Sequence, residues 1–308
     1  MNNFIEYFYG IKVDKIVYEK NSYSFIYNKY FYKLYVFDNS SNTDFLINVN
    51  KKMLGNTLVS EIIKNRNGEV LSIYNNIGYI LMRIYVNVNK GISLKEVVSL
   101  SNSLYKDKLM INWGNLWERK MDYLEDLINE NGKKYPLIVD SFNYFVGLAE
   151  NAISYYNTIL IDENYKFGIS HRKIKIDDTI EELYNPLNII FDYKVRDVAE
   201  YMKISFFNGN KNALNEFIWY LNNNYLSIME AKLLIARLLY PSFYFDMYED
   251  IMIDEKEEKI ITNILTKIDE YEIYLAKLIE MISSKYGVDD ILWLKKSNYS
   301  IWDEPRFL

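Results

Sequence analysis

The chain has 308 residues, half of them hydrophobic and a quarter charged, and a formal net charge of -6. This length exceeds the size at which one hydrophobic core stops growing, so two lobes are expected, and the composition excludes disordered and fibrous classes. The acidic balance argues against nucleic acid as a partner, and the absence of Cys with only one His excludes disulfides, thiolate sites and imidazole clusters but leaves a carboxylate magnesium site open.

The first segment, MNNFIEYFYG, lacks the basic stretch and the apolar run of a secretory signal. No apolar run in the chain reaches the roughly 18 residues needed to cross a bilayer. We therefore expect a cytoplasmic protein without membrane insertion.

Residues 12–37 are rich in Val, Ile, Tyr and Phe, and apolar residues alternate with other residues along them. This alternation predicts three strands. The breaks fall at the polar pairs Lys20-Asn21 and Asn28-Lys29, which are short enough to close hairpins, so the predicted sheet is antiparallel and local.

A helix is predicted from Asp44 to Leu54, because its apolar residues recur at a spacing of four and Gly55 stands at a helix stop. Two further strands are predicted at Glu69–Ile73 and Tyr79–Tyr85, joined by a turn at Asn75-Asn76. The first part of the chain is thus expected to hold five strands and one helix.

Three regions follow from these patterns: an N-terminal β-rich lobe at 1–86, a linker at 87–93, and a C-terminal helical lobe at 94–308. Threefold and fourfold apolar spacing predicts helices at Leu94–Tyr105, Leu116–Asn129, Ser141–Ile159, Arg196–Phe206, Lys211–Asn222, Ser227–Leu239 and Glu255–Tyr286. Between these helices, short β-like pieces separated by polar loops are predicted at Ile159–Ile161, Phe167–Ile169 and Asn188–Phe191.

This order of elements resembles the layout of protein kinases and aminoglycoside phosphotransferases. The expected fold class is therefore α+β, a protein-kinase-like two-lobe fold with a small antiparallel sheet and a mainly helical second lobe. In that layout the third strand carries a Lys that contacts nucleotide phosphates, and Tyr30-Phe31-Tyr32-Lys33 is similar to it. Lys33 is the candidate nucleotide-binding residue; the alternative is an ordinary charged residue on an outward strand face.

The catalytic loop of these phosphotransferases has a His, an Asp two residues later and an Asn five residues after that Asp. His171 resembles the family His, but Lys173 stands at the catalytic Asp, and a Lys cannot accept a substrate proton as a carboxylate does. Asp178 stands where the Asn is expected and is a metal candidate. For His171 the structural alternative is a buried imidazole satisfied by a backbone carbonyl.

The segment Asn188–Glu200 is similar to the strand-to-helix passage that follows the loop in the family. The resemblance makes Asp192 the candidate metal-binding Asp and Asp197 a structural residue that ties down the catalytic loop. A solvated loop carboxylate is the alternative for Asp192, and a helix cap is the alternative for Asp197. The connection between the two is shorter than in active relatives.

The turn between the first two strands covers the nucleotide phosphates in active kinases and uses Gly for close backbone approach. This chain has Glu19-Lys20-Asn21-Ser22 there. The turn weakens the expectation of nucleotide binding without excluding it.

Among kinase-like families, the chain resembles the spore coat group that includes CotS and YutH over nearly its whole length. The resemblance is carried by Phe191-Asp192-Tyr193 with Arg196-Asp197-Val198-Ala199-Glu200, by residues 237–246, and more weakly by Trp117-Glu118-Arg119. It implies other spore coat proteins as partners, synthesis in the mother cell and assembly on the spore coat.

Three functions remain open. The leading hypothesis is a pseudokinase that acts as a scaffold or binding module of the coat without a cofactor, because of Lys173. The alternative is a small-molecule kinase that uses ATP and magnesium held by Asp177, Asp178 and Asp192, with Lys33 on the phosphates. A third hypothesis retains nucleotide as a structural ligand without turnover.

Overall fold

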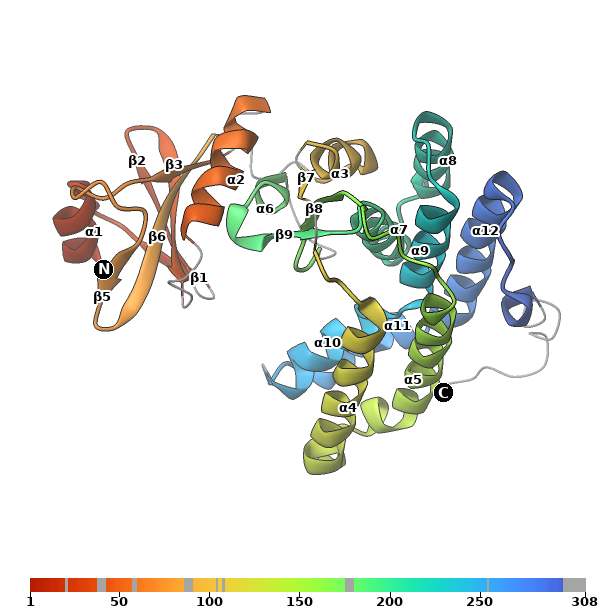
Figure 1. Cartoon of the computed structure of the whole chain (residues 1–308). Coiled ribbons are helices and arrows are strands. Elements are labelled where there is room, and N and C mark those ends of the chain that lie inside the picture. Colours follow the sequence, from red (N-terminus) through yellow and green to blue (C-terminus); the bar gives the residue numbers. More distant parts are fainter. Residues whose placement is uncertain are drawn as a thin grey trace. The chain divides into compact units, whose positions relative to one another are not determined.

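The computed structural model describes residues 1–19, 22–37, 43–56, 60–85, 91–103, 105–106, 109–174, 180–253 and 255–295. The chain divides into two compact units (Figure 1). The first unit contains residues 1–92, 171–173 and 177–189, and the second contains residues 93–170, 174–176 and 190–308. Of the predicted linker, residues 87–90 lie outside the described residues.

The first unit is built on an antiparallel sheet whose strands follow the order β1-β2-β3-β6-β4, with β5 also paired to β6. The strands are β1 (Val17–Glu19), β2 (Ser22–Tyr27), β3 (Tyr30–Phe37), β4 (Ser60–Ile63), β5 (Ser72–Tyr74) and β6 (Ile77–Ile84). The long central strands β3 and β6 pair over seven residues, from Phe31 with Ile84 to Phe37 with Gly78.

Two predicted turns are confirmed, and both use positive backbone φ angles. Asn28 and Lys29 have φ of 48° and 68°, and Asn75 and Asn76 have φ of 50° and 64°. A two-residue hairpin of this type requires positive φ at both central positions, which Asn tolerates better than most residues. The pair Lys20-Asn21 lies outside the described residues.

Within residues 1–85 of the first unit, two of the described elements were not predicted, and one predicted strand is wrong in part. The helix α1 (Asn2–Tyr9) precedes the sheet, and β4 follows the predicted helix. The strand predicted at Glu69–Ile73 begins only at Ser72. Residue 69 belongs instead to a loop in which Asn65 receives hydrogen bonds from the backbone, so local polar bonding replaces the sheet there.

Each face of this sheet has its own apolar core. On one face α1 packs against Phe25, Leu34 and Leu81. On the other face α2 (Thr43–Asn56), near the predicted bounds, packs its Leu46 against Ile80 and Met82. Neighbouring strand residues alternate between these faces, so Lys33 lies on the α2 face.

The second unit is mainly helical and has the buried helix α9 at its centre. Helices α5, α7 and α12 all pack against α9, whose residues 233–239 are almost entirely buried. The helices of at least eight residues are α3 (Leu94–Ser101), α4 (Trp113–Asn131), α5 (Pro136–Asn157), α7 (Arg196–Phe207), α8 (Ala213–Asn223), α9 (Ile228–Leu239), α10 (Ser242–Met252) and α12 (Ile268–Tyr286). A small sheet orders β7 (Tyr105–Lys106), β8 (Phe167–His171) and β9 (Ile189–Asp192).

The helix predicted from Glu255 to Tyr286 is wrong in its first third. The chain forms a short 3-10 turn (Glu258–Ile261) and α11 (Thr262–Leu265) before α12 begins at Ile268. Glu255 has a φ of 54°, which no continuous helix contains. Apolar spacing is similar in short turns and in long helices, so periodicity does not locate such breaks.

Two other expectations for this unit differ from the structure. The helix predicted to end at Tyr105 ends at Ser101, and residues 159–161 form no strand. The aromatic residues after Pro241 fill the core of this unit as part of a helix, α10. Pro241 immediately precedes this helix, a position that tolerates the missing N–H of Pro.

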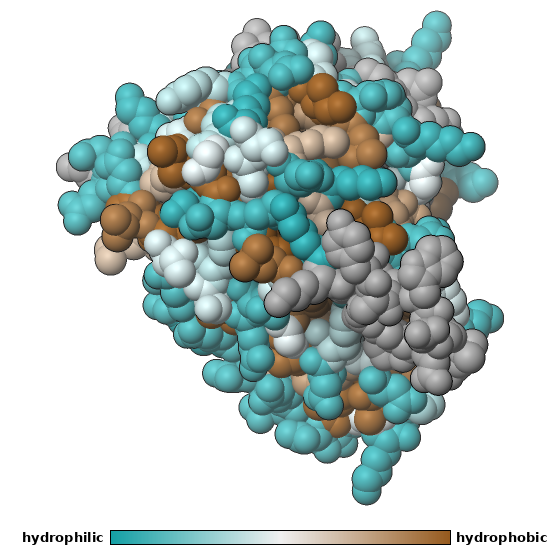
Figure 2. Space-filling model, turned by 90° about the vertical axis from the view of Figure 1, so that its right-hand side faces the viewer, coloured by the Kyte–Doolittle hydropathy of each residue, from teal (hydrophilic) through white to brown (hydrophobic). Residues whose placement is uncertain are grey.

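Hydrophilic and apolar residues are mixed on the surface of the described residues. On the face shown in Figure 2, apolar residues form small patches separated by hydrophilic residues, which is normal for a protein surface. Within the described residues, no helix combines the length and the apolar character that a bilayer span requires.

Candidate functional site

Lys33 lies on β3, where its backbone partners are Ser24 on β2 and Met82 on β6. Its side chain is 14% exposed, and its Nζ lies 3.7 Å from Oε1 of Glu182, whose side chain is 32% exposed. Glu182 belongs to the short helix α6 (Ile180–Leu183) of the same unit. Lys33 therefore has a carboxylate partner within its own unit, and nucleotide binding by Lys33 stays a prediction.

Helix α2 offers Lys33 no glutamate. Its sequence, TDFLINVNKKMLGN, contains one carboxylate, Asp44, in the first turn. Protein kinases pair the strand lysine with a glutamate of the neighbouring helix. Here α2 presents Asn50, whose Nδ2 donates to Ser60 O and whose Oδ1 accepts from Ile62 N, both at 3.1 Å. The helix thus anchors the edge strand β4 through Asn50.

A cavity of about 570 Å³ lies beside β1, β2 and β3 in the first unit. It is lined by Val17, Ser24 and Phe31, which share the sheet face of Lys33 because Val17 pairs with Ser24 and Ser24 pairs with Lys33. Lys12 and Lys15 also line it. Asp14 and Phe25 line it as well, and Phe25 belongs to the core on the opposite face, so the cavity lies at the edge of the sheet and Lys33 is not among its lining residues.

The loop after β8 is held by Asn188. Arg172 N donates to Asn188 O at 2.8 Å, and Lys173 N donates to Oδ1 of Asn188 at 3.3 Å. The Asn188 side-chain amide donates in turn to Lys173 O at 2.9 Å. The backbone at Lys173, the position of the family's catalytic Asp, is therefore fixed on both its N–H and its C=O.

His171 is 2% exposed, and its Nε2 lies 2.7 Å from Leu183 O. This geometry is that of a buried imidazole satisfied by a backbone carbonyl. The two following carboxylates of the sequence argument, Asp177 and Asp178, lie outside the described residues. Their role as metal ligands stays a prediction.

Asp192 ends β9 and is 6% exposed. Its Oδ1 accepts from Nε1 of Trp113 at 3.0 Å and from the N–H of Tyr193 at 2.7 Å, and its Oδ2 lies 3.3 Å from Nη1 of Arg196. Burial raises the pKa of Asp192 although Arg196 and Arg237 oppose this rise. The Asp192 carboxylate is thus held within the second unit by two neutral N–H donors and by the Arg196 guanidinium.

The surroundings of Asp192 do not fit a magnesium site. Mg²⁺ binds carboxylate oxygens that face water and phosphate, and it dehydrates reluctantly. Asp192 is instead enclosed by N–H donors, and the guanidinium of Arg196 supplies the positive charge. Among the described residues, no three carboxylate or imidazole side chains gather into a group that could hold a metal ion.

Asp197 is fully buried in the first turn of α7. The helix begins at Arg196 as predicted, and its N-cap residue is Val195, so Asp197 is not the cap. A carboxylate in the first turn is stabilised by the positive end of the helix dipole. The tie between Asp197 and the catalytic loop stays a prediction.

A buried ionic cluster that the sequence argument missed follows along α7. Lys203 is fully buried, and its Nζ lies within hydrogen-bonding distance of four oxygens: Glu200 Oε1 at 3.0 Å, Arg237 O at 3.0 Å, Tyr240 O at 2.9 Å and Ser242 Oγ at 2.7 Å. The carbonyls belong to the end of α9, where a cation is favoured by the helix dipole. Burial lowers the pKa of Lys203 to about 8, although Glu200 opposes this shift.

Glu200 is the anion of this cluster. Its Oε1 also accepts from Nε of Arg237 at 2.5 Å, and its Oε2 accepts from Oγ of Ser242 at 2.6 Å. Burial raises the pKa of Glu200, but the charges of Arg237 and Lys203 outweigh burial and bring it to about 2. Glu200 therefore stays ionised and joins α7, α9 and the start of α10.

Arg237 connects this cluster to Asp192. Its guanidinium carbon lies 5.3 Å from the ring centroid of Trp113 and 5.7 Å from that of Trp117, within the range of cation–π attraction. Trp113 is the residue that donates to Asp192. The only sequence signal for the cluster was the Glu200–Lys203 pair at i,i+3, a spacing that usually marks an exposed helix face.

The sequence model of the family described as "Spore coat putative kinase YutH" matches residues 2–278. The endospore coat-associated protein YutH of Bacillus subtilis (strain 168) is 27% identical over 210 residues, which are 60% of this chain and 62% of that protein. The match thus spans less than two thirds of that relative's length.

Solved structures show the same fold at low identity. An aminoglycoside phosphotransferase from Alicyclobacillus acidocaldarius matches with a TM-score of 0.64 at 11% identity, covering 90% of this chain and 94% of that one. Amicoumacin kinase hAmiN, solved with AMP-PNP and Ca²⁺, matches with a TM-score of 0.51 at 10% identity, covering 92% and 93%. The fold is kinase-like, as predicted. By its sequence, this chain belongs to the YutH family of spore coat proteins.

Proposed function

We propose that this spore coat family member is a binding or scaffold protein that has given up phosphoryl transfer. The observation that carries the proposal is the environment of Asp192, whose carboxylate is buried against Trp113 and paired with Arg196. Withdrawing this carboxylate to bind a metal would break its contacts with the Trp113 indole N–H and the Arg196 guanidinium inside the second unit, which is costly.

The loop supports the same conclusion. Phosphotransferases of this fold use an Asp to orient the attacking hydroxyl and accept its proton. Lys173 occupies that position, and its backbone is held by Asn188 on both sides. A lysine there repels a second cation and accepts no proton while it is charged.

Other spore coat proteins are the proposed partners, with synthesis in the mother cell and assembly on the spore coat. The family membership supports this assignment, and the net charge of -6 argues against nucleic acid. No cofactor is part of the proposal.

A phosphotransfer assay tests the proposal directly. The purified chain is incubated with ATP and Mg²⁺ and with a panel of sugars, amino alcohols and coat proteins. We expect no product above the protein-free blank. Product formation that disappears in both Asp192→Asn and Lys33→Met would contradict the proposal and establish an unusual small-molecule kinase.

Nucleotide binding without turnover is the second candidate, and the cavity beside Val17, Ser24 and Phe31 favours it. A ligand that binds only the folded state raises the melting temperature by mass action. Thermal unfolding with ATP, with and without Mg²⁺, therefore separates the candidates. A shift lost in Lys33→Met, without hydrolysis, supports a structural nucleotide, whereas no shift supports a scaffold without nucleotide.

A further inference from the structure

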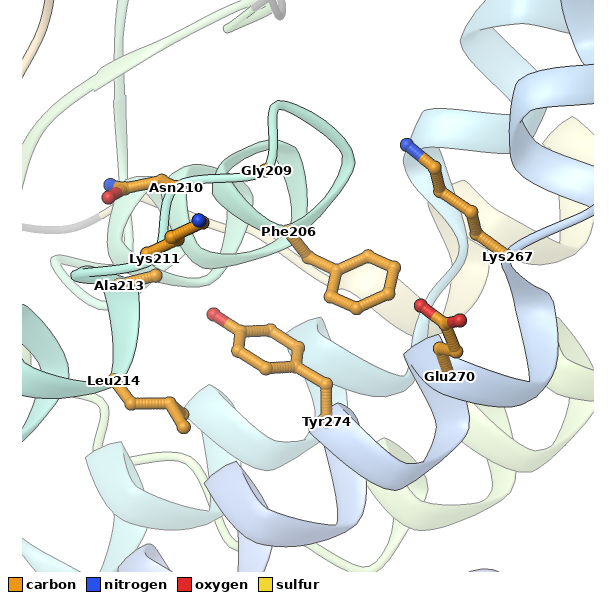
Figure 3. Close-up of a pocket in the computed structure, with 9 residues that line it drawn as sticks. All are labelled: Phe206, Gly209, Asn210, Lys211, Ala213, Leu214, Lys267, Glu270 and Tyr274. Carbon is orange, nitrogen blue, oxygen red and sulfur yellow. The ribbon is translucent and has the colours of Figure 1, made fainter.

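A second cavity, of about 390 Å³, opens in the second unit where α7 ends and where α8 and α12 begin (Figure 3). It lies at the far end of α7 from Asp192, and the 12 residues of that helix span about 18 Å. The cavity is therefore separate from the site described above. Its volume is at the low end of the range for small-ligand pockets, enough for one bulky side chain with its adjacent backbone.

The floor of this cavity is aromatic. The ring centroids of Phe206 and Tyr274 lie 5.1 Å apart, and Figure 3 shows the two rings side by side at its centre. Phe206 also contacts Tyr271, whose ring stacks on Phe207 in the core. The Tyr274 hydroxyl donates to Met202 O at 3.2 Å. The two rings are thus fixed by the core behind them; Tyr274 is 8% exposed and Phe206 is half-buried, so a further ring would lie mainly against Phe206.

The rim carries more positive than negative charge. Lys211 and Lys267 line the cavity together with one carboxylate, Glu270. In the view of Figure 3, the two ammonium groups lie on opposite sides of the Phe206 side chain. Glu270 lies in the first turn of α12, where the helix dipole already accounts for a carboxylate. Among the lining residues the cations thus outnumber the carboxylates by one, and the next carboxylate, Glu216, accepts a hydrogen bond from Asn210, so the charge of the lining favours an anionic ligand.

We propose that this cavity binds a short segment of a partner protein in which an aromatic side chain is followed by a carboxylate. The ring lies against Phe206 and Tyr274, and the carboxylate approaches Lys211 or Lys267. This inference rests on the proposed binding role of the chain and names the chemistry of the partner. An aromatic ring alone would leave the two lysines unused, and a carboxylate alone would leave the apolar floor in water.

The test uses the full chain and a capped tetrapeptide, acetyl-Gly-Trp-Glu-Gly-amide, with binding followed by ligand-observed NMR. Replacing Glu by Gln in the peptide is expected to weaken binding about fivefold, because a charge-assisted contact is lost. Replacing Trp by Ala is expected to abolish measurable binding. Equal affinity for the Glu and Gln peptides, or no binding of the parent peptide at millimolar concentration, would overturn the proposal.

A charge-reversed chain and a matched control locate the binding site. The double variant Lys211→Glu with Lys267→Glu is expected to bind the parent peptide at least about tenfold more weakly. Lys133→Glu with Lys134→Glu makes the same change in net charge at exposed positions outside the cavity and is expected to stay within about twofold. Equal weakening in both variants would mean general electrostatic attraction and would refute the site.

Two further measurements keep the interpretation unambiguous. Phe206→Leu keeps an apolar side chain in the floor but removes a ring. It is expected to weaken binding of the parent peptide, measured at a temperature at which the variant is still folded. Sedimentation velocity on the free chain tests whether a second copy of the chain occupies the cavity. A dimer that disappears in the Lys211→Glu and Lys267→Glu double variant would overturn the assignment to a partner protein. ATP turnover is measured separately, so failure of the scaffold proposal and failure of this peptide site are distinguishable.

Discussion

An ion pair of the first unit and a charged cluster of the second differ in their exposure to water. In the first unit, Lys33 and Glu182 approach to 3.7 Å with side chains 14% and 32% exposed. In the second unit, Glu200, Lys203 and Arg237 form shorter contacts and are almost completely excluded from water. Water screens the first pair and not the second group, so the same residue types should differ strongly in their effect on stability.

The largest expected effect comes from Glu200→Gln. This change leaves Lys203 and Arg237 buried without their anion and should lower the free energy of unfolding by about 3–5 kcal/mol. Urea unfolding followed by circular dichroism measures the loss. Glu150→Gln, at an exposed position of α5, is the matched control and should change stability by less than about 0.5 kcal/mol. Similar losses in both variants would show that the buried cluster stabilises the fold no more than an exposed glutamate does.

Acid should remove the same contribution. The pKa of Glu200 is about 2 in the folded chain, below its ordinary value of 4.5, so the unfolded chain binds more protons between these values. The free energy of unfolding therefore falls as the pH drops from about 5 towards 2, by about 3 kcal/mol from this group. Unfolding curves between pH 6 and pH 3 should thus converge for the native chain and Glu200→Gln. Parallel curves would assign the acid sensitivity to other carboxylates.

Asp192→Asn should have an intermediate effect. It removes the charge that faces Arg196 while keeping an oxygen for Trp113 Nε1, and the expected loss is about 1–3 kcal/mol without any ligand present. Differential scanning calorimetry measures the loss, with Asp126→Asn on the exposed face of α4 as control. A variant as stable as the native chain, with a weaker response to Mg²⁺, would instead identify Asp192 as a metal ligand.

Lys33→Met should have the smallest effect. The pair with Glu182 is partly exposed and 3.7 Å long, so its loss should cost less than about 1 kcal/mol. A double-mutant cycle with Glu182→Gln isolates the coupling between the two side chains. A coupling energy comparable to that of the Glu200 cluster would remove the contrast between the two units.

Local pattern was sufficient for much of the fold. Alternating residues predicted β2 and β3, and the polar pairs Asn28-Lys29 and Asn75-Asn76 predicted the two turns. Apolar spacing predicted α4, α5, α7, α8 and α9 within about five residues at each end. The order of these elements was enough to indicate the kinase-like fold. Breaks within a periodic segment, as before Ile268, were missed because spacing alone does not report backbone hydrogen bonds.

The sequence by itself predicted that Lys173 stands where the family has its catalytic Asp, and that Asp192 precedes a helix with Asp197 in its first turn. Only the tertiary structure decided that Asp192 is enclosed by Trp113 and Arg196, and that Glu200 and Lys203 are buried with Arg237. The physical reason is that a charged residue on a helix is compatible with both water and an ion-pair core. Which of these it meets depends on the segments far along the chain, here α4 and α9, that pack against it.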